Sequence, residues 1–167
     1  MNFRALYVAI KLFHRQMIIF REALPMDIPQ MQVVRNAVKE NVLSDPQLVT
    51  DAQYLEFLSG KGKGWVCVVD DILIGFAIAD LEKNNIWALF VHPAFERQGI
   101  GKKLHRLMLD WYFSMTSKTV WLSTAPHSRA AQFYMQQGWA CVGNTNQVEL
   151  KFEITADQWR KKYASRL

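Results

Sequence analysis

The chain has 167 residues, of which 50% are hydrophobic and 21% are charged, and its formal net charge is +5. This composition is typical of a globular domain with a sizeable core and excludes a disordered or fibrous chain. A charge of +5 spread over a whole domain is too modest to indicate nucleic acid, an anionic membrane or a polyanionic ligand by itself.

The N-terminal stretch, residues 1–16, is basic and contains no acidic residue. Its longest uncharged run, residues 5–10, is far too short for the apolar part of a signal sequence or for a membrane span. Residues 17–23, MIIFREA, read as the natural first strand. We therefore expect an N-terminal extension over 1–16, a single domain over 17–167, no membrane association and a cytoplasmic location.

The first part of the domain predicts one strand followed by two helices. Residues 18–21 alternate weakly and favour a strand. A helix is expected from Asp27, as its cap, to about Val42, because apolar residues recur there every three to four positions. A second short helix is expected over about 48–58, and the run Gly60-Lys-Gly-Lys-Gly64 is typical of a flexible basic loop.

The remainder predicts an alternation of strands and helices. Asp70-Asp71 separates two apolar, β-branched runs, which is the pattern of a tight antiparallel hairpin. Thr155 and Gln158 have the spacing of a capping box for a C-terminal helix reaching about Ser165. The expected strands are 65–69, 72–81, 86–91, 120–124 (buried on both sides), 139–142 and 148–154, and the expected helices are 99–115 and 129–137. This order indicates one α+β domain with helices packed on a mixed sheet.

Two cysteines, Cys67 and Cys141, each lie in an apolar segment without CxxC or Cys/His spacing. They are interpreted as buried thiols in a reducing compartment, and no metal site is expected.

A short glycine-containing loop joins the strand over 86–91 to the helix that follows it. Gly99 and Gly101 stand where that helix begins. The first turn of a helix leaves N–H groups unpaired and carries the positive end of the helix dipole, and glycine lets a ligand approach the backbone closely. The loop therefore resembles a phosphate-binding cradle.

Two motifs in order carry a family resemblance that covers nearly all of residues 18–154. The first is Leu89-Phe-Val-His-Pro93 followed by Arg97-Gln-Gly-Ile-Gly-Lys102, and the second is Arg129-Ala-Ala-Gln-Phe-Tyr-Met-Gln-Gln-Gly-Trp139. Together they resemble the GNAT superfamily of acetyl-CoA-dependent N-acetyltransferases. The resemblance implies a mixed, mostly antiparallel central sheet that is splayed at the acetyl-CoA site and flanked by helices.

The resemblance also implies roles for the first motif. Backbone N–H groups of the loop would hold the CoA pyrophosphate, with positive charge from Arg97, Lys102 and Lys103. Those N–H groups belong to Gln98, Gly99, Ile100, Gly101 and Lys102. Backbone groups of Leu89, Phe90 and Val91 would pair with the pantetheine arm, and an N–H near Phe90 and Val91 would stabilise the oxyanion formed from the thioester.

In the second motif, Tyr134 stands where many relatives keep a tyrosine that protonates the departing thiolate, although it could equally pack its helix on the sheet. The chain departs from the family pattern at two places. Glu96 replaces a Gln or Arg ahead of the glycines. His127 replaces an asparagine, and it could bind the pantetheine arm or cap the helix.

No acidic residue stands on the strand near Asn85, where some relatives keep a glutamate base. Glu82 is expected to be a solvated turn residue, and His92 has a suitable ordinary pKa but precedes a proline. Deprotonation through water, or without a protein base, is therefore left open.

The resemblance therefore implies that the chain is an acyltransferase. We expect it to move the acetyl group of acetyl-CoA directly to a primary amine, on a small molecule or a protein. The acceptor is expected near residues 41–54 and the loops 60–64 and 144–146. The alternative is a non-catalytic acyl-CoA-binding or sensor module. Nucleic acid is not expected as a partner, because the lysines lack interleaved aromatics. Homodimerisation through a terminal strand or the C-terminal helix is left open.

Overall fold

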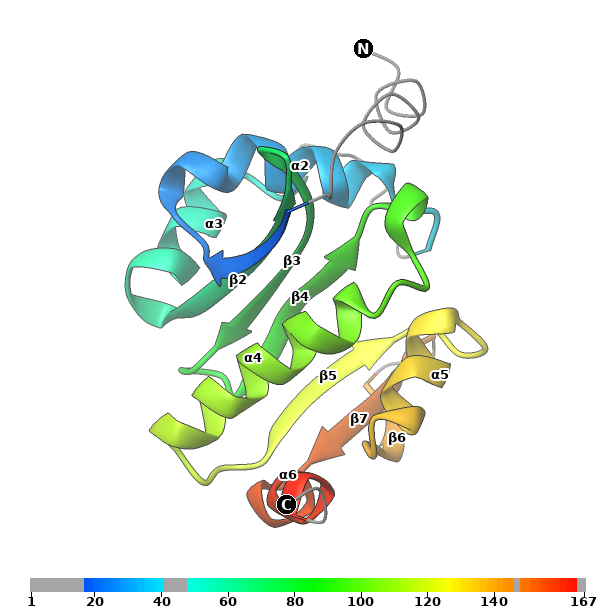
Figure 1. Ribbon diagram of the computed structural model, residues 1–167. Coiled ribbons are helices and arrows are strands. Elements are labelled where there is room, and N and C mark those ends of the chain that lie inside the picture. The colour runs from blue at the N-terminus through cyan, green and yellow to red at the C-terminus, as the bar shows by residue number, and fades with distance from the viewer. Residues whose placement is uncertain (1–16, 41–47, 146–147, 165–167) are drawn as a thin grey trace.

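The computed structural model describes residues 17–40, 48–145 and 148–164 (Figure 1). Its strands are β1 (Ile18–Glu22), β2 (Gly62–Val69), β3 (Ile72–Asp80), β4 (Asn85–Val91), β5 (Val120–Thr124), β6 (Ala140–Asn144) and β7 (Leu150–Ile154). Its α-helices are α2 (Ile28–Ala37), α3 (Asp51–Glu56), α4 (Ile100–Met115), α5 (Arg129–Gln136) and α6 (Ala156–Ala164). Every strand and helix predicted within these ranges is present, with ends that differ by a few residues.

The strands form one sheet in the order β1-β2-β3-β4-β5-β7-β6. All neighbouring strands are antiparallel except β4 and β5, which run parallel and pair only at Asn85 and Trp121. Beyond this pair, toward their carboxyl ends, β4 and β5 are not hydrogen-bonded to each other. The expected mixed, mostly antiparallel sheet with a splay between two strands is therefore confirmed.

Helices cover both faces of the sheet. Side chains of β3 alternate: Phe76 and Ile78 pack with α2 and α3, whereas Ala77 and Ala79 pack with α4. In Figure 1, α4 crosses in front of the sheet, and α2 and α3 lie behind it. We call these the α4 face, which α5 and α6 also cover, and the α2 face.

Local sequence accounts for several of the turns. Asp70 and Asp71 have φ values of 47° and 66°, so both central residues of the β2–β3 hairpin take the left-handed conformation of a type I′ turn. Thr155 and Gln158 form the expected capping box, with Gln158 N–H donating to Thr155 Oγ1 at 3.2 Å and Thr155 N–H donating to Gln158 Oε1 at 2.8 Å.

The start and end of α2 correct two expectations. Asp27 does not cap α2 with its side chain; its carboxylate instead accepts hydrogen bonds from Leu24 N–H at 2.7 Å and from the Arg21 guanidinium. The helix ends at Ala37 because Val38 is extended, with φ −71° and ψ 149°. Val42, the expected last residue of the helix, lies outside the described residues.

The glycine-rich segment 60–64 is not a flexible loop. Residues 57–61 form a π-helical turn, and Gly62 begins β2. A Cβ on Gly62 would lie 1.7 Å from the Ala79 carbonyl oxygen, so glycine is needed there because two backbones approach closely. By strand register this segment lies at the end of the sheet opposite the carboxyl end of β4, so its expected role beside the acceptor was wrong.

Two burial expectations also need correction. Strand β5 alternates between buried residues and the partly buried Trp121 and Ser123, so it is not buried on both sides. Cys67 is buried as expected, but Cys141 is exposed on β6. No helix in the described ranges is long and apolar enough to cross a membrane.

Candidate functional site

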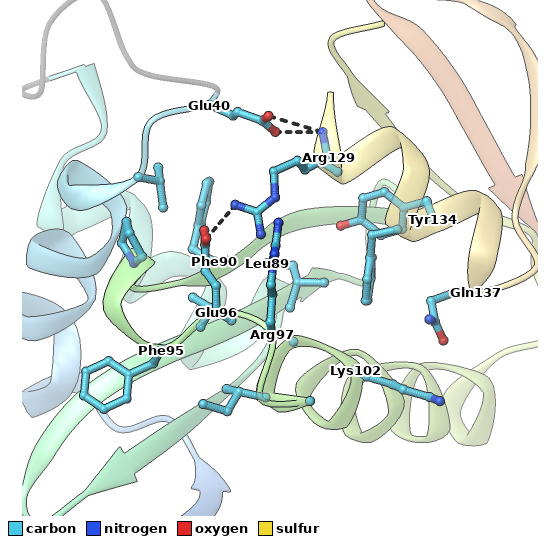
Figure 2. A pocket seen from close by; sticks show the side chains of 18 of the residues that line it. Glu40, Leu89, Phe90, Phe95, Glu96, Arg97, Lys102, Arg129, Tyr134 and Gln137 are labelled. Carbon is cyan, nitrogen blue, oxygen red and sulfur yellow. Dashed lines mark hydrogen bonds and ion pairs between the residues drawn. The ribbon is translucent and has the colours of Figure 1, made fainter. Parts of the chain in front are cut away.

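A cavity of about 750 Å³ lies where β4 and β5 separate. Its walls come from the end of β4, the loop into α4, the first turn of α4, α5 and the short segment after α2 (Figure 2). Of the predicted site residues, those that line it are Leu89, Phe90, Val91, Arg97, Gly99, Ile100, Gly101, Lys102 and Tyr134. The fold thus brings the two sequence motifs together around one opening.

The backbone of β4 offers unpaired groups to this opening. His92 N–H donates to the Ile74 carbonyl on β3 at 2.7 Å. Because N–H groups alternate in direction along an antiparallel strand, Phe90 N–H also faces β3, whereas Leu89 and Val91 N–H face away from it. The Leu89 and Val91 N–H groups therefore point toward β5. Strand β5 pairs with β4 only at Asn85, so it does not pair with these two groups. Of the two N–H groups expected to meet the oxyanion, the register excludes that of Phe90 and retains that of Val91.

The loop before α4 is shaped by its backbone. Gly99 is the N-cap of α4 with φ 79°, and a Cβ built on it would meet nothing within 4 Å. Glycine is therefore favoured for its left-handed conformation rather than for lack of space. Gly101 is different, because a Cβ there would make only an ordinary contact with Val91 at 3.6 Å. The first turn of α4 opens toward the cavity, where exposed Arg97 and Lys102 add positive charge.

Tyr134 lies on α5 with only 7% of its surface exposed. In Figure 2 its hydroxyl points into the cavity, on the side of Leu89 and Arg129. The ring packs against Trp139 and Phe152, with centroid distances of 5.4 Å and 6.3 Å. Burial raises the pKa of the Tyr134 hydroxyl, so it is protonated throughout the neutral range. Packing on the sheet and facing the cavity are therefore both properties of this residue.

Arg129 links the two sides of the opening, a feature that the sequence analysis did not find. Its guanidinium pairs with Glu96, on the loop after β4, at 2.5 Å, and its backbone N–H donates to the Glu40 carboxylate at 3.0 Å (Figure 2). Glu40 comes from the segment after α2, 89 residues away along the chain. Glu40 and Glu96 are the carboxylates that line the cavity among the described residues, and both contact Arg129.

Two predicted cofactor-binding residues, Gln98 and His127, do not line the cavity. His127 is exposed with φ 60°, and the cap of α5 is its neighbour Ser128, whose Oγ accepts from Ala131 N–H at 3.0 Å. The helix-cap interpretation of His127 was therefore wrong. A serine directly before an apolar-periodic helix is the usual cap signal and could have identified Ser128.

The structure also places the two candidate bases, Glu82 and His92. Glu82 is exposed in the turn before β4, as expected. His92 is partly buried, and its Nδ1 accepts a hydrogen bond from Ala94 N–H at 3.1 Å. Burial lowers the pKa of His92, although nearby Glu96 raises it somewhat, and His92 is not a lining residue of the cavity.

Comparison with known proteins identifies the family. The family model described as "Acetyltransferase (GNAT) family" matches residues 31–139. The chain belongs to the GNAT acetyltransferase family. It is therefore an acetyltransferase, and acetyl-CoA is its cosubstrate. A search of curated proteins found no match.

Solved structures share the fold at low sequence identity. The PaiA N-acetyltransferase of Thermoplasma acidophilum, solved with coenzyme A, superimposes with a TM-score of 0.73 at 16% identity, over 83% of this chain and 99% of that one. The ribosomal-protein-S18-alanine N-acetyltransferase of Escherichia coli gives 0.67 at 15% identity, over 83% and 94%. Ard1 of Thermoplasma volcanium gives 0.68 at 18% identity, over 83% and 97%.

Proposed function

We propose that this chain is an N-acetyltransferase that passes the acetyl group of acetyl-CoA directly to a primary amine while both substrates are bound. The observation that carries the proposal is the shared opening. The unpaired Val91 N–H, the Tyr134 hydroxyl and the first turn of α4 all face the gap where β4 and β5 separate. An anion-binding helix start, a hydrogen-bond donor and an acid thus lie within one cavity.

The residues present fit the cosubstrate. The first turn of α4 offers unpaired N–H groups and a positive dipole end for the pyrophosphate, and Arg97, Lys102 and Lys103 add charge. Gln98 and His127 do not line the cavity. If they contact the cosubstrate, they do so at the edge of the cavity. Leu89 and Val91 N–H groups can pair with the pantetheine arm as a neighbouring strand would.

Acetyl-CoA supplies an acetyl group joined to sulfur as a thioester. In this proposal Val91 N–H donates to the thioester carbonyl oxygen, where negative charge grows as the amine nitrogen forms its bond to carbon. As the carbon–sulfur bond breaks, Tyr134 gives its proton to the departing sulfur. The proton that the amine loses restores the tyrosine through water, since both cavity carboxylates already contact Arg129. Transfer of the acetyl group needs no covalent enzyme intermediate in this scheme.

Ligand-dependent thermal melting tests the first half of the proposal. A ligand that binds only the folded chain raises its melting temperature, so acetyl-CoA and CoA should stabilise the protein and NADH and ATP should not. Release of free thiol in the presence of a panel of primary amines then tests transfer. Stabilisation by acetyl-CoA without thiol release on any amine would indicate a non-catalytic acyl-CoA-binding module. No stabilisation by either CoA ligand would overturn the binding assignment.

A further inference from the structure

The α2 face contains a group of buried polar atoms that have no partner. The Tyr54 hydroxyl and the Nε and Nη1 atoms of Arg35 are buried without a hydrogen bond that meets distance and angle criteria among the described residues. Tyr54 is fully buried, with 0% of its surface exposed. An unpaired buried polar group destabilises the folded chain, so these neighbouring donors call for a ligand that completes them.

Two aromatic rings fix the Arg35 guanidinium. Its central carbon lies 4.8 Å from the centroid of the Phe90 ring and 5.3 Å from that of the Trp87 ring. Tyr54 meets Trp87 edge-on, with 5.0 Å between centroids. Stacking on ring faces holds the guanidinium without using its N–H groups, which point outward along its edges. The arginine is thus held in place while its donors stay available.

Electrostatics agrees with a shared site for Arg35 and Tyr54. Burial raises the pKa of the Tyr54 hydroxyl, and Arg35 partly offsets this through its positive charge and through its side chain's closeness to the hydroxyl. Within the described ranges no carboxylate forms an ion pair with Arg35. Arg35 as a whole is only partly buried, whereas its Nε and Nη1 atoms and the Tyr54 hydroxyl are buried, so binding requires the side chains that cover these atoms to move.

The position relative to the cavity suggests which ligand this is. Phe90, which carries the Arg35 guanidinium on its ring, is also a wall of the cavity where β4 and β5 separate. Val38, three residues after Arg35, lines the same cavity. The phosphate cradle approaches this cavity from the α4 side, so the α2 side is left for the second substrate.

We infer that Arg35, with the Tyr54 hydroxyl, binds a carboxylate of the acceptor, so that the amine acetylated by this enzyme belongs to an acidic molecule. The inference rests on the proposed acetyl transfer and names the substrate class of that same site. A planar carboxylate matches the two parallel N–H donors of a guanidinium, and the tyrosine hydroxyl adds a third donor. Both a free amino acid and an acidic residue at the start of a peptide carry this chemistry.

The test is thiol release from acetyl-CoA on matched pairs of amines that differ only in carboxylate against carboxamide. The free pairs are glycine with glycinamide, β-alanine with β-alaninamide, aspartate with asparagine and glutamate with glutamine. The peptide pairs begin with Asp against Asn and with Glu against Gln. The carboxylate member of at least one pair should show a kcat/KM about ten- to a hundredfold higher, because a hydrogen bond to a charged group contributes about that much. If the carboxylate member is preferred only among the free amines, the acceptor is a free amino acid. If it is preferred only among the peptides, the acceptor is a peptide with an acidic first residue.

Variants assign the preference to Arg35. Arg35→Met should lower kcat/KM for the carboxylate members much more than for the carboxamide members, so that the preference is lost. Arg35→Lys should retain part of it, since the charge stays but the paired donors are lost. Tyr54→Phe should reduce it by less than Arg35→Met does. Arg160→Met, an exposed arginine on α6 whose side chain is 62% accessible, is the matched control.

Stability separates this role from a structural one. Because Arg35 leaves buried donors unpaired, Arg35→Met should not lower the melting temperature of the free protein. A preference that survives in Arg35→Met, or equal use of both members of every pair, overturns the carboxylate assignment while leaving acetyl transfer intact. A fall in melting temperature with an equal loss on all amines means that Arg35 is structural, and it also overturns the assignment. Absence of transfer to any amine overturns the proposed function, and the inference with it.

Discussion

The α4 face and the α2 face of the sheet obtain their polar groups in different ways. On the α4 face, the groups that line the cavity come mainly from backbone and from two continuous motifs, residues 89–102 and 129–139. On the α2 face, the group that includes Arg35, Tyr54 and Trp87 comes from two helices and a strand that are well separated in sequence. The polar atoms of the α2 group lack partners, whereas Leu89 and Val91 N–H are free because β5 diverges.

This difference matches the two tasks of a transferase. Backbone groups at a strand end and a helix start can bind the cosubstrate with many different side chains around them. The acceptor differs among enzymes, and side chains brought together from distant segments can change without disturbing the sheet. The comparison therefore predicts that variants on the two faces affect different substrates.

The largest effect is expected from a charge placed in the cradle. Gly99→Glu should weaken CoA binding on the order of a hundredfold or more, because its carboxylate would lie beside the phosphates. The chain should still fold, at a small cost in stability, because a Cβ at Gly99 meets nothing within 4 Å but the left-handed φ of 79° disfavours other residues. Calorimetric titration with CoA measures the loss. Gly143→Glu is the control, because Gly143 also has a positive φ, 139°, and open space around it. Normal affinity in Gly99→Glu would refute the cradle.

The next effect tests the acid on the α4 face. Tyr134→Phe should lower kcat about a hundredfold with little change in the KM for acetyl-CoA, the loss typical of a missing general acid. Because burial raises the pKa of Tyr134, its deprotonation should cause no fall in kcat below about pH 10. Tyr112→Phe makes the same chemical change outside the cavity, where the hydroxyl donates to Asn84 at 2.8 Å. Steady-state kinetics measure both variants. If Tyr134→Phe and Tyr112→Phe have equal kcat values, Tyr134 is not the general acid.

A third prediction concerns the core beneath the cavity. His105 is fully buried on α4, its Nε2 accepts from Trp139 Nε1–H at 2.9 Å, and burial lowers its pKa to about 3. The unfolded chain takes up the proton near pH 6.5 and the folded chain does not. This group therefore contributes a fall in the free energy of unfolding that approaches about 1.4 kcal/mol per pH unit below 6.5. Urea unfolding at pH 7.5 and pH 5 measures the slope. His105→Leu should flatten it, and an unchanged slope would refute the assignment.

The smallest effect is expected on the α2 face. Burial raises the pKa of Asp27, but hydrogen bonds from Arg21 and Leu24 N–H lower it further, so its net shift is downward. The ionised carboxylate therefore stabilises the fold above about pH 4, and that stabilisation is lost as the pH falls through the folded pKa. Asp27→Asn should lower the free energy of unfolding at pH 7 by about 1 kcal/mol, because Arg21 is partly exposed. The difference in the free energy of unfolding between Asp27→Asn and the wild-type chain should narrow as the pH falls below about 4. A difference that is independent of pH would contradict this account.

The sequence predicted the α4 face well because its determinants are local. A hydrophobic strand, a glycine with positive φ and an amphipathic helix follow one another over residues 86–115, so neighbouring positions along the chain define this strand, loop and helix. Segment 60–64 shows the limit of the same reasoning. Glycine is typical of loops, but Gly62 is needed because the Ala79 carbonyl lies where a Cβ would be, which no local pattern reveals.

By itself the sequence determined the order of strands and helices, the glycine-containing loop before α4 and the helix that carries Tyr134, because hydrogen-bond patterns and capping depend on residues a few positions apart. Only the tertiary structure decided which N–H groups face the opening, how Arg129 joins Glu40 and Glu96, and that Arg35 lies on Phe90 and Trp87. These contacts join residues separated by tens of positions. They exist only after the sheet has formed, since packing rather than local propensity brings such side chains together.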